Sequence, residues 1–298
     1  MTQLHEVEQI ALLDMSKSSN VRPGPFIKWA GGKTQLLHQF DRLFPTRYNR
    51  YYEPFVGSGA VFFHLLPSEA VLSDANPNLI AVYRHIQYNV EELIYFLYDL
   101  RNRYHTMPPQ EQEREYYRIR ELYNDTPSGS LEKAAFLIFL NKTGYNGLYR
   151  ESKRGGYNVP FGRYDNPAMF DESNLRAVSQ ALQHVTLLNT DFSSVVETAQ
   201  EGDFVYFDPP YVPLTKTASF TSYTMGEFTQ EQQSKLADVA RHLAHKGVLI
   251  MLSNSSHDAV RELYRDWYVH EVKANRAVNS KPDLRGKITE LVVTTYEI

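Results

Sequence analysis

Residues 51–60, YYEPFVGSGA, place a short β-prone run directly before a glycine-containing turn and the start of a helical pattern. Gly57 and Gly59 tolerate backbone conformations that other residues avoid, so the turn can approach a ligand closely. A strand, a glycine turn and a helix in this order are typical of nucleotide-binding α/β sheets. The stretch therefore predicts an α/β fold with a nucleotide-type ligand beyond the strand.

Short β-prone runs recur along the chain, each bounded by turn or capping residues as buried strands are. They are AVLSD (70–74), VTLLN (185–189), DFVYF (203–207), GVLIML (247–252) and LVVTTYEI (291–298). Helical patterns separate many of these runs, and this alternation is typical of a largely parallel sheet.

The middle of the chain follows a different pattern. Residues 77–141 predict three consecutive amphipathic helices, over 78–104, 111–123 and 131–141. The stretch 142–164, here called the hairpin segment, places the turn signal Arg154-Gly155-Gly156 between two aromatic arms and predicts a β-hairpin. We therefore divide the chain into three parts. These are an N-terminal extension at 1–24 without an assigned function, a catalytic domain at 25–76 and 165–298, and an insertion at 77–164.

Composition excludes several classes of protein. The 298 residues include no cysteine, which excludes disulfides, thiolate zinc sites and a cysteine nucleophile. The ten histidines show no ligand spacing, so we expect no metal. The longest apolar run, 134–140, is far shorter than the roughly 20 residues that span a bilayer, so we expect a cytoplasmic protein without a membrane span. A net charge of −4 argues against a polycation that coats nucleic acid, although residues 141–164 hold five basic residues against one acidic residue.

The tetrapeptide Asp208-Pro209-Pro210-Tyr211 directly follows the predicted strand 203–207, where open α/β sheets bind ligands. An aromatic amino nitrogen such as adenine N6 is a poor nucleophile because its lone pair is delocalised into the ring. The Asp208 carboxylate can accept a hydrogen bond from one N–H of the amino group. A carbonyl of the Pro-Pro segment, most naturally that of Pro209, can accept from the other N–H. Together these hydrogen bonds favour the pyramidal nitrogen of the transition state. Tyr211 supplies a ring on which an extruded base can stack. The alternative is a rigid turn after a strand.

The loop FVGSG (55–59), which begins with Phe55, lacks the third glycine of the dinucleotide fingerprint. Phe62 occupies that position, which disfavours NAD or FAD. Asp74 follows Gly57 by 17 residues and is the candidate partner for ribose hydroxyls. The alternative for this pair is a glycine turn followed by a helix-capping aspartate.

The stretch FIKWAGGKT (26–34) contains Gly-Lys-Thr, but isoleucine stands where a phosphate loop needs glycine, so ATP hydrolysis is not expected. Trp29 and Lys33 can instead lie over a sulfonium cofactor and reach its carboxylate. Asp191 and Phe192 can accept from the cofactor's adenine amino group and stack on its ring. Each pair also has a simpler interpretation. Trp29 can be an exposed aromatic residue and Lys33 a helix-start lysine, while Asp191 can be a helix N-cap and Phe192 a core phenylalanine.

In this order, the motifs closely resemble those of DNA adenine N6-methyltransferases of the Dam type, from Phe26 to the C-terminus. The motifs are FIKWAGGK, EPFVGSGAVFF, LSDANP, NKTGYNGLYR, GGYNVPFGRY, NTDF, VYFDPPY and LSNSS. The resemblance implies a Rossmann-like methyltransferase sheet that uses S-adenosylmethionine. It also implies that Trp29, Lys33, Asp74 and Asp208 contact this cofactor, and that residues 208–211 hold the flipped adenine.

In that family the hairpin segment reads the sequence GATC, which makes residues 77–164 a target-recognition insertion. The matching positions here are Tyr145, Asn146, Leu148, Arg150 and Tyr164, and Lys28 resembles an additional DNA contact. Arg150 can pair bidentately with guanine, and Leu148 can contact a thymine methyl group. Tyr145 can fill the gap left by the flipped base.

We therefore expect an enzyme that transfers a methyl group from S-adenosylmethionine to N6 of a flipped-out adenine in double-stranded DNA, within GATC. Two alternatives stay open. The same fold can act on RNA adenine or on a protein amide nitrogen, or the chain can be a DNA-binding regulator without chemistry. A cognate restriction nuclease that acts on the same site is a candidate partner.

Overall fold

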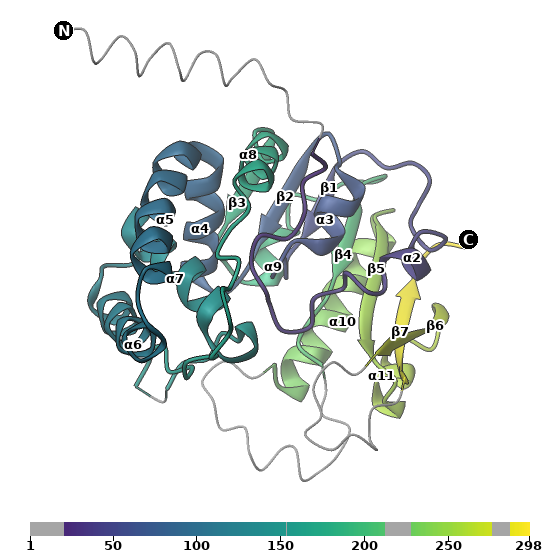
Figure 1. Ribbon diagram of the computed structural model, residues 1–298. Coiled ribbons are helices and arrows are strands. Elements are labelled where there is room, and N and C mark those ends of the chain that lie inside the picture. Colours follow the sequence, from purple (N-terminus) through teal and green to yellow (C-terminus); the bar gives the residue numbers. More distant parts are fainter. Residues whose placement is uncertain (1–20, 153, 212–227, 276–286) are drawn as a thin grey trace, which may run out of the picture.

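The computed structural model describes residues 21–152, 154–211, 228–275 and 287–298, which contain a seven-stranded sheet (Figure 1). Most of the predicted N-terminal extension lies outside these ranges. The strands are β1 (Tyr51–Glu53), β2 (Ala70–Ser73), β3 (Val185–Leu188), β4 (Phe204–Phe207), β5 (Leu249–Ser255), β6 (Tyr268–Asn275) and β7 (Lys287–Thr294). Their order is β3-β2-β1-β4-β5-β7-β6, with β7 antiparallel to its two neighbours and the other pairs parallel. The predicted α/β fold with a largely parallel sheet is confirmed.

The edge strand β6 is missing from the sequence prediction. Its residues include His270, Glu271 and Lys273, which interrupt the apolar pattern of a buried strand. The strand is held by an antiparallel ladder with β7 that runs from the Tyr268–Thr294 pair to the Asn275–Lys287 pair. The ladder joins two consecutive strands, so β6 escapes prediction because of its polar and charged residues and not because its partner is distant.

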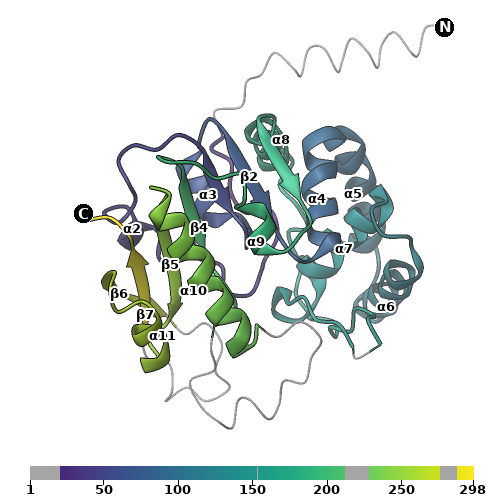
Figure 2. The same ribbon diagram turned by 180° about the vertical axis from the view of Figure 1, so that it is seen from behind.

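Helices cover both faces of the sheet (Figures 1 and 2). Successive strand residues point to opposite faces. Tyr51 and Phe204 accordingly join the core that contains α2 (Leu37–Phe40) and α3 (Ala60–Leu65). Their neighbours Tyr52 and Val205 join a second core, which contains α9 (Phe192–Val195), α10 (Gln230–His245) and α11 (Asp258–Leu263). The central strands β1, β2, β4 and β5 are therefore buried on both faces, and only their ends can carry a site.

Residues 77–143 form four helices instead of the three predicted. They are α4 (Pro77–Tyr88), α5 (Val90–His105), α6 (Pro109–Asp125) and α7 (Leu131–Thr143). The prediction of one helix over 78–104 is wrong, because the chain leaves the helical conformation at Asn89, with φ −133° and ψ 34°. Both α4 and α5 pack against α7, which requires the chain to turn between them. The predicted helices over 111–123 and 131–141 are confirmed.

A buried glutamine joins this helical segment to the sheet. Gln87 on α4 donates from Nε2 to the carbonyls of Leu182, at 2.6 Å, and Val185, at 2.9 Å. These carbonyls lie between α8 (Glu172–Ala181) and the start of β3. The amide therefore fixes the helices against the edge of the sheet.

The hairpin segment doubles back without forming a continuous two-stranded ladder. Isolated antiparallel bridges join Gly144 to Phe161 and Glu151 to Tyr157. Asn124 on α6 forms hydrogen bonds of 2.8 and 3.2 Å with the backbone of Tyr157. The predicted hairpin is thus present only as a folded-back loop, because α6 side chains satisfy backbone groups that a partner strand would otherwise satisfy.

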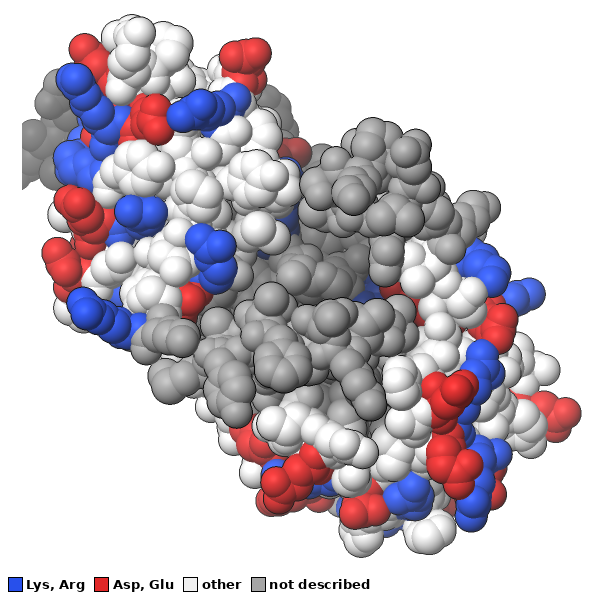
Figure 3. Space-filling model, turned by 90° about the horizontal axis from the view of Figure 1, so that it is seen from below, with Lys and Arg blue, Asp and Glu red and all other residues white. Residues whose placement is uncertain are grey.

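Basic and acidic side chains are mixed on the described surface of the face seen from below (Figure 3). This mixture agrees with the net charge of −4, and the described part of this face carries no uniform positive field. Within the described ranges, no helix has both the length and the apolarity to cross a bilayer.

The last residue of β1, Glu53, is a buried carboxyl group with 2% exposure. The Tyr51 hydroxyl donates to its Oε2 at 2.8 Å. Burial raises the pKa of Glu53 to about 8; the Tyr51 hydrogen bond lowers it in part, and the charge of Asp208 raises it further. Glu53 is therefore mostly protonated at pH 7.

This raised pKa predicts a pH-dependent stability. Between its unfolded pKa of roughly 4.3 and its folded pKa, Glu53 binds a proton only in the folded state, so its contribution to the free energy of unfolding falls as pH rises. We expect the stability of the wild type relative to Glu53→Gln to fall from pH 6 to pH 8, by at most about 1.4 kcal/mol per pH unit. Urea denaturation of both proteins measures this difference, and a difference that does not vary with pH would contradict it.

Candidate active site

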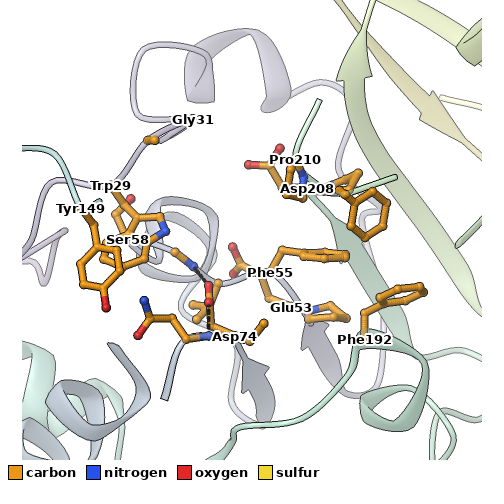
Figure 4. A pocket seen from close by; sticks show the side chains of 18 of the residues that line it. Trp29, Gly31, Glu53, Phe55, Ser58, Asp74, Tyr149, Phe192, Asp208 and Pro210 are labelled. Atoms are coloured by element: carbon orange, nitrogen blue, oxygen red, sulfur yellow. Dashed lines mark hydrogen bonds between the residues drawn. The ribbon is translucent and has the colours of Figure 1, made fainter. Parts of the chain in front are cut away.

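A cavity of about 1060 Å³ lies at the carboxyl ends of the central parallel strands (Figure 4). Glu53 ends β1, Asp74 follows β2, Asp191 follows β3 and Asp208 follows β4, and all four line the cavity. The topology therefore gathers four carboxyl groups from distant parts of the sequence at one edge of the sheet. Among the described residues, no group of three or more metal-ligating side chains has a metal-binding arrangement.

The most buried charge contact in the cavity joins Lys33 to Asp208. The Lys33 ammonium lies 2.7 Å from Asp208 Oδ1, and the two side chains are 5% and 16% exposed. Burial raises the pKa of Asp208 to about 6, although the adjacent Lys33 charge lowers it in part. In the described part of the chain, no donor contacts the second oxygen, Oδ2, which leaves it available to a ligand.

Lys33 is itself held in place by two further contacts. It donates to the carbonyl of Gly31 at 2.6 Å and lies 4.9 Å from the centre of the Tyr211 ring. The ammonium thus links the loop at 29–33 to the Asp-Pro-Pro-Tyr segment. The simpler interpretation of Lys33 as a helix-start residue is wrong, because α2 begins only at Leu37.

The glycine loop at 55–59 approaches Trp29 too closely for a side chain at position 57. Gly57 has φ 48°, and a Cβ there would lie 2.9 Å from Trp29 Cδ1. The Gly57 amide donates to Asp74 Oδ2 at 3.1 Å, while Asp74 Oδ1 accepts from the Asn76 amide at 2.9 Å. Asn76 provides the N-cap of α4, so the interpretation of Asp74 as the helix cap is wrong. Burial raises the pKa of Asp74.

The opposite wall of the cavity is aromatic. The Phe55 and Phe192 rings are stacked, with centroids 5.5 Å apart and an interplanar angle of 28°. Asp191 accepts from the Ser193 amide at 3.0 Å as the N-cap of α9, and its Oδ1 lies 2.9 Å from Lys235 Nζ. The interpretation of Asp191 and Phe192 as an N-cap and a core phenylalanine is therefore confirmed, although both also line the cavity.

Several cavity residues were not among the predicted site residues, and Glu53 and Tyr149 are two of them. Glu53 could have been found from its position at the end of a strand that enters the glycine loop. Tyr149, from the hairpin segment, stacks on Trp29 with ring centroids 5.1 Å apart and an interplanar angle of 29°. Its neighbours Arg150, Glu151 and Ser152 also line the cavity, so the hairpin segment and the glycine loop share one space.

These residues fit S-adenosylmethionine, which combines an adenosine, an amino-acid end and a sulfonium cation. Aromatic rings and buried carboxylates suit a cation, and the glycine loop permits close backbone approach. Asp74 can accept from ribose hydroxyls, and Lys33 can pair with the amino-acid carboxylate. Phe55 and Gly57 also line the cavity, whereas Gly59 does not: a Cβ there would meet Tyr83 and Phe63.

The predicted DNA-binding residues gather beside the cavity. Tyr145 is 51% exposed, and Leu148 and Arg150 are also exposed. The Tyr164 hydroxyl accepts from the Asn146 amide at 2.8 Å, and Lys28 Nζ lies 5.7 Å from the Tyr164 ring centre. The structure thus brings together residues from three separate motifs, FIKWAGGK, NKTGYNGLYR and GGYNVPFGRY.

Asn141, which was not among the predicted site residues, joins the FIKWAGGK and NKTGYNGLYR motifs. Its side chain forms 2.9 Å hydrogen bonds with both the amide and the carbonyl of Lys28. It also donates to the Gly147 carbonyl at 2.8 Å. Its position inside the NKTGYNGLYR motif is the signal that could have identified it.

Comparisons with known proteins agree with this geometry. A type II methyltransferase of Lactococcus lactis subsp. cremoris, M1.LlaDCHI, is 41% identical over 290 residues, covering 95% of this chain and 99% of the relative. A type II methyltransferase of Methanocaldococcus jannaschii, M.MjaIII, is 42% identical over 285 residues, covering 91% and 99%. The DNA adenine methylase of Escherichia coli (strain K12) is 35% identical over 267 residues, covering 90% and 93%.

The family described as D12 class N6 adenine-specific DNA methyltransferase matches residues 29–278. This match agrees with the DNA adenine reaction that the sequence favours over RNA, a protein amide or a regulator without chemistry. The chain belongs to the D12 class of N6 adenine-specific DNA methyltransferases, which use S-adenosylmethionine as the methyl donor.

Proposed function

We propose that this enzyme methylates adenine N6 within GATC in duplex DNA, after the target base has been extruded into the cavity. One observation carries the proposal: the Asp208 carboxylate and the hairpin residues Tyr149 to Ser152 line the same cavity. A segment that contacts the duplex therefore lies beside the group that would hold the reacting base. The duplex must release its adenine because the N6 group is paired inside the stack.

The roles proposed within the tetrapeptide follow from hydrogen-bonding capacity. Asp208 Oδ2 accepts one N–H of the target amino group, and the Pro209 carbonyl accepts the other. Together they localise the nitrogen lone pair, and the ring of Tyr211 stacks on the base. S-adenosylmethionine, when bound, supplies an electrophilic methyl group. As the nitrogen forms its bond to the methyl carbon, the methyl–sulfur bond breaks and a neutral thioether leaves, and the methylated nitrogen then releases one proton to water.

Recognition of GATC is proposed for the exposed surface that contains Tyr145, Leu148 and Arg150. Arg150 donates from Nε to Asn158 Oδ1 at 2.7 Å and from Nη2 to the Asn158 carbonyl at 3.0 Å. These contacts hold the guanidinium in one orientation and leave its remaining N–H groups for the acceptor atoms of a guanine. A cognate restriction nuclease for the same site stays a prediction.

The target sequence can be tested with short duplexes and labelled S-adenosylmethionine. One duplex contains GATC, and the others each carry one changed base pair within the site. We expect N6-methyladenine in the GATC duplex and a loss of transfer by roughly 5-fold or more for each change, since a mismatch costs about 1–3 kcal/mol. Equal transfer to all duplexes would rule out GATC as the target.

Asp208 should produce an acidic limb in the pH–rate profile, that is, a fall of kcat/KM at low pH. Protonation removes its acceptor capacity, so kcat/KM should fall about tenfold per pH unit below the pKa of about 6. Asp208→Asn should lose this limb because amide protonation does not occur in this range. Asp208→Ala should lower kcat by roughly 10²–10³ and weaken cofactor binding.

A matched control is Asp203→Asn, because Asp203 is also buried but precedes β4 and accepts from the amides of Arg50 and Gln200. This variant should keep the acidic limb while losing stability. Undiminished transfer by Asp208→Ala, or an unchanged limb in Asp208→Asn, would show that Asp208 does not hold the amino group.

Arg150→Ala should relax the choice of base at one guanine of the site, at a cost of roughly 1–3 kcal/mol in discrimination. The matched control is Arg163→Ala, since the 78% exposed Arg163 side chain lies at the other end of the hairpin segment, 3.7 Å from Glu113. The control should leave the choice of base unchanged. Transfer rates on the same set of duplexes measure both effects, and unchanged discrimination in Arg150→Ala would refute the assignment.

A further inference from the structure

The carbonyl of Pro210 is held by a side chain from another element. Gln233, on α10, donates from Nε2 to this carbonyl at 3.0 Å and is 1% exposed. Its own Oε1 accepts from Asn254 Nδ2, on β5, at 3.1 Å. Asn254 is fully buried, and its Oδ1 accepts from the Ser255 amide at 2.8 Å. A chain of buried amides therefore runs from β5 through α10 to the Asp-Pro-Pro-Tyr segment.

The chain has a defined direction. Asn254 uses its carbonyl oxygen on the Ser255 amide, so its NH₂ group must face Gln233. The Gln233 carbonyl oxygen then faces Asn254, which leaves its NH₂ group for Pro210. Each amide is thus fixed in one of its two orientations by the next polar group.

Satisfying a buried carbonyl does not by itself explain this contact. Pro210 is an exposed residue beside the cavity, and solvent could satisfy its carbonyl. A buried glutamine carries an entropic and desolvation cost that an apolar side chain would avoid. What the contact adds is a fixed direction for a carbonyl in the cavity wall.

That direction constrains the preceding carbonyl. The proline rings fix φ at positions 209 and 210, so few rotations remain between Asp208, paired with Lys33, and the anchored Pro210 carbonyl. With the Pro210 oxygen turned toward α10, the Pro209 oxygen remains for a ligand. No donor in the described ranges contacts it. At the other end of the segment, the Tyr211 hydroxyl donates to Glu290 on β7 at 2.7 Å.

We propose that Gln233, oriented by Asn254, is a positioning residue that fixes the Pro-Pro segment so that the Pro209 carbonyl accepts the second N–H of the target adenine. This inference rests on the proposed function, because it presumes that the base enters the cavity beside Asp208. Gln233 does not contact the base. It acts by holding one of the two acceptors that localise the nitrogen lone pair.

The test is Gln233→Met, which conserves volume and removes the donor. Its matched control is Gln87→Met, because Gln87 is a similarly buried glutamine that donates to two carbonyls away from the cavity. Single-turnover transfer to a GATC duplex gives the rate of the chemical step. A 2-aminopurine in place of the target adenine reports base extrusion by its fluorescence.

We expect Gln233→Met to slow the chemical step roughly 10- to 100-fold, while KM for DNA, cofactor affinity and the 2-aminopurine signal change little. Gln87→Met should lower thermal stability but keep the rate. A second variant, Asn254→Leu, removes the group that orients Gln233 and should also slow transfer. A merely structural role would lower stability in all three variants and leave the rate of the folded enzyme unchanged.

The outcomes separate the two proposals. A wild type that neither methylates the GATC duplex nor raises 2-aminopurine fluorescence would overturn the proposed function. An active wild type with a Gln233→Met variant of equal single-turnover rate would overturn only the positioning role. Loss of 2-aminopurine signal in Gln233→Met would also overturn it, because the residue would then act on base binding.

Discussion

The buried ion pair between Lys33 and Asp208 is the constraint on which the rest of the site depends. Asp208 lies at the end of a strand that is buried on both faces, where its charge is costly without a nearby cation. The cation comes from a loop that precedes the whole sheet, so this loop must pack across the strand ends. Glu53 lies in the same region and remains mostly protonated, which limits the negative charge that Lys33 must balance.

The same loop also connects the proposed cofactor region with the proposed DNA-binding surface. Asn141 binds both backbone groups of Lys28, and Trp29 stacks on Tyr149 of the hairpin segment. The long helical segment between β2 and β3 therefore returns to the catalytic edge of the sheet. Its α6 holds the hairpin segment in place through Asn124 and Tyr116. A single cavity then joins the residues that would read the duplex to the carboxylate that would hold the base.

Much of this arrangement could be predicted because its signals are local. Short apolar runs mark the parallel strands, and the rule that ligands bind at their carboxyl ends places Asp74 and Asp208 together. The edge strand β6 was missed because His270, Glu271 and Lys273 interrupt its apolar pattern. The break at Asn89 depends on the packing of α4 and α5 against α7, which a local pattern does not encode. Gln233 and Asn141 were missed because their partners lie 23 and 113 residues away in sequence.

The most direct test of the account uses plasmid DNA from a host without adenine methylation that expresses this chain. One sample is cut with a nuclease that adenine methylation of GATC blocks, and a second with a nuclease that requires this methylation. Methylation of GATC by the enzyme predicts protection from the first nuclease and cleavage by the second. Plasmid that the first nuclease cuts and the second leaves intact, in cells that contain the folded protein, would contradict the account.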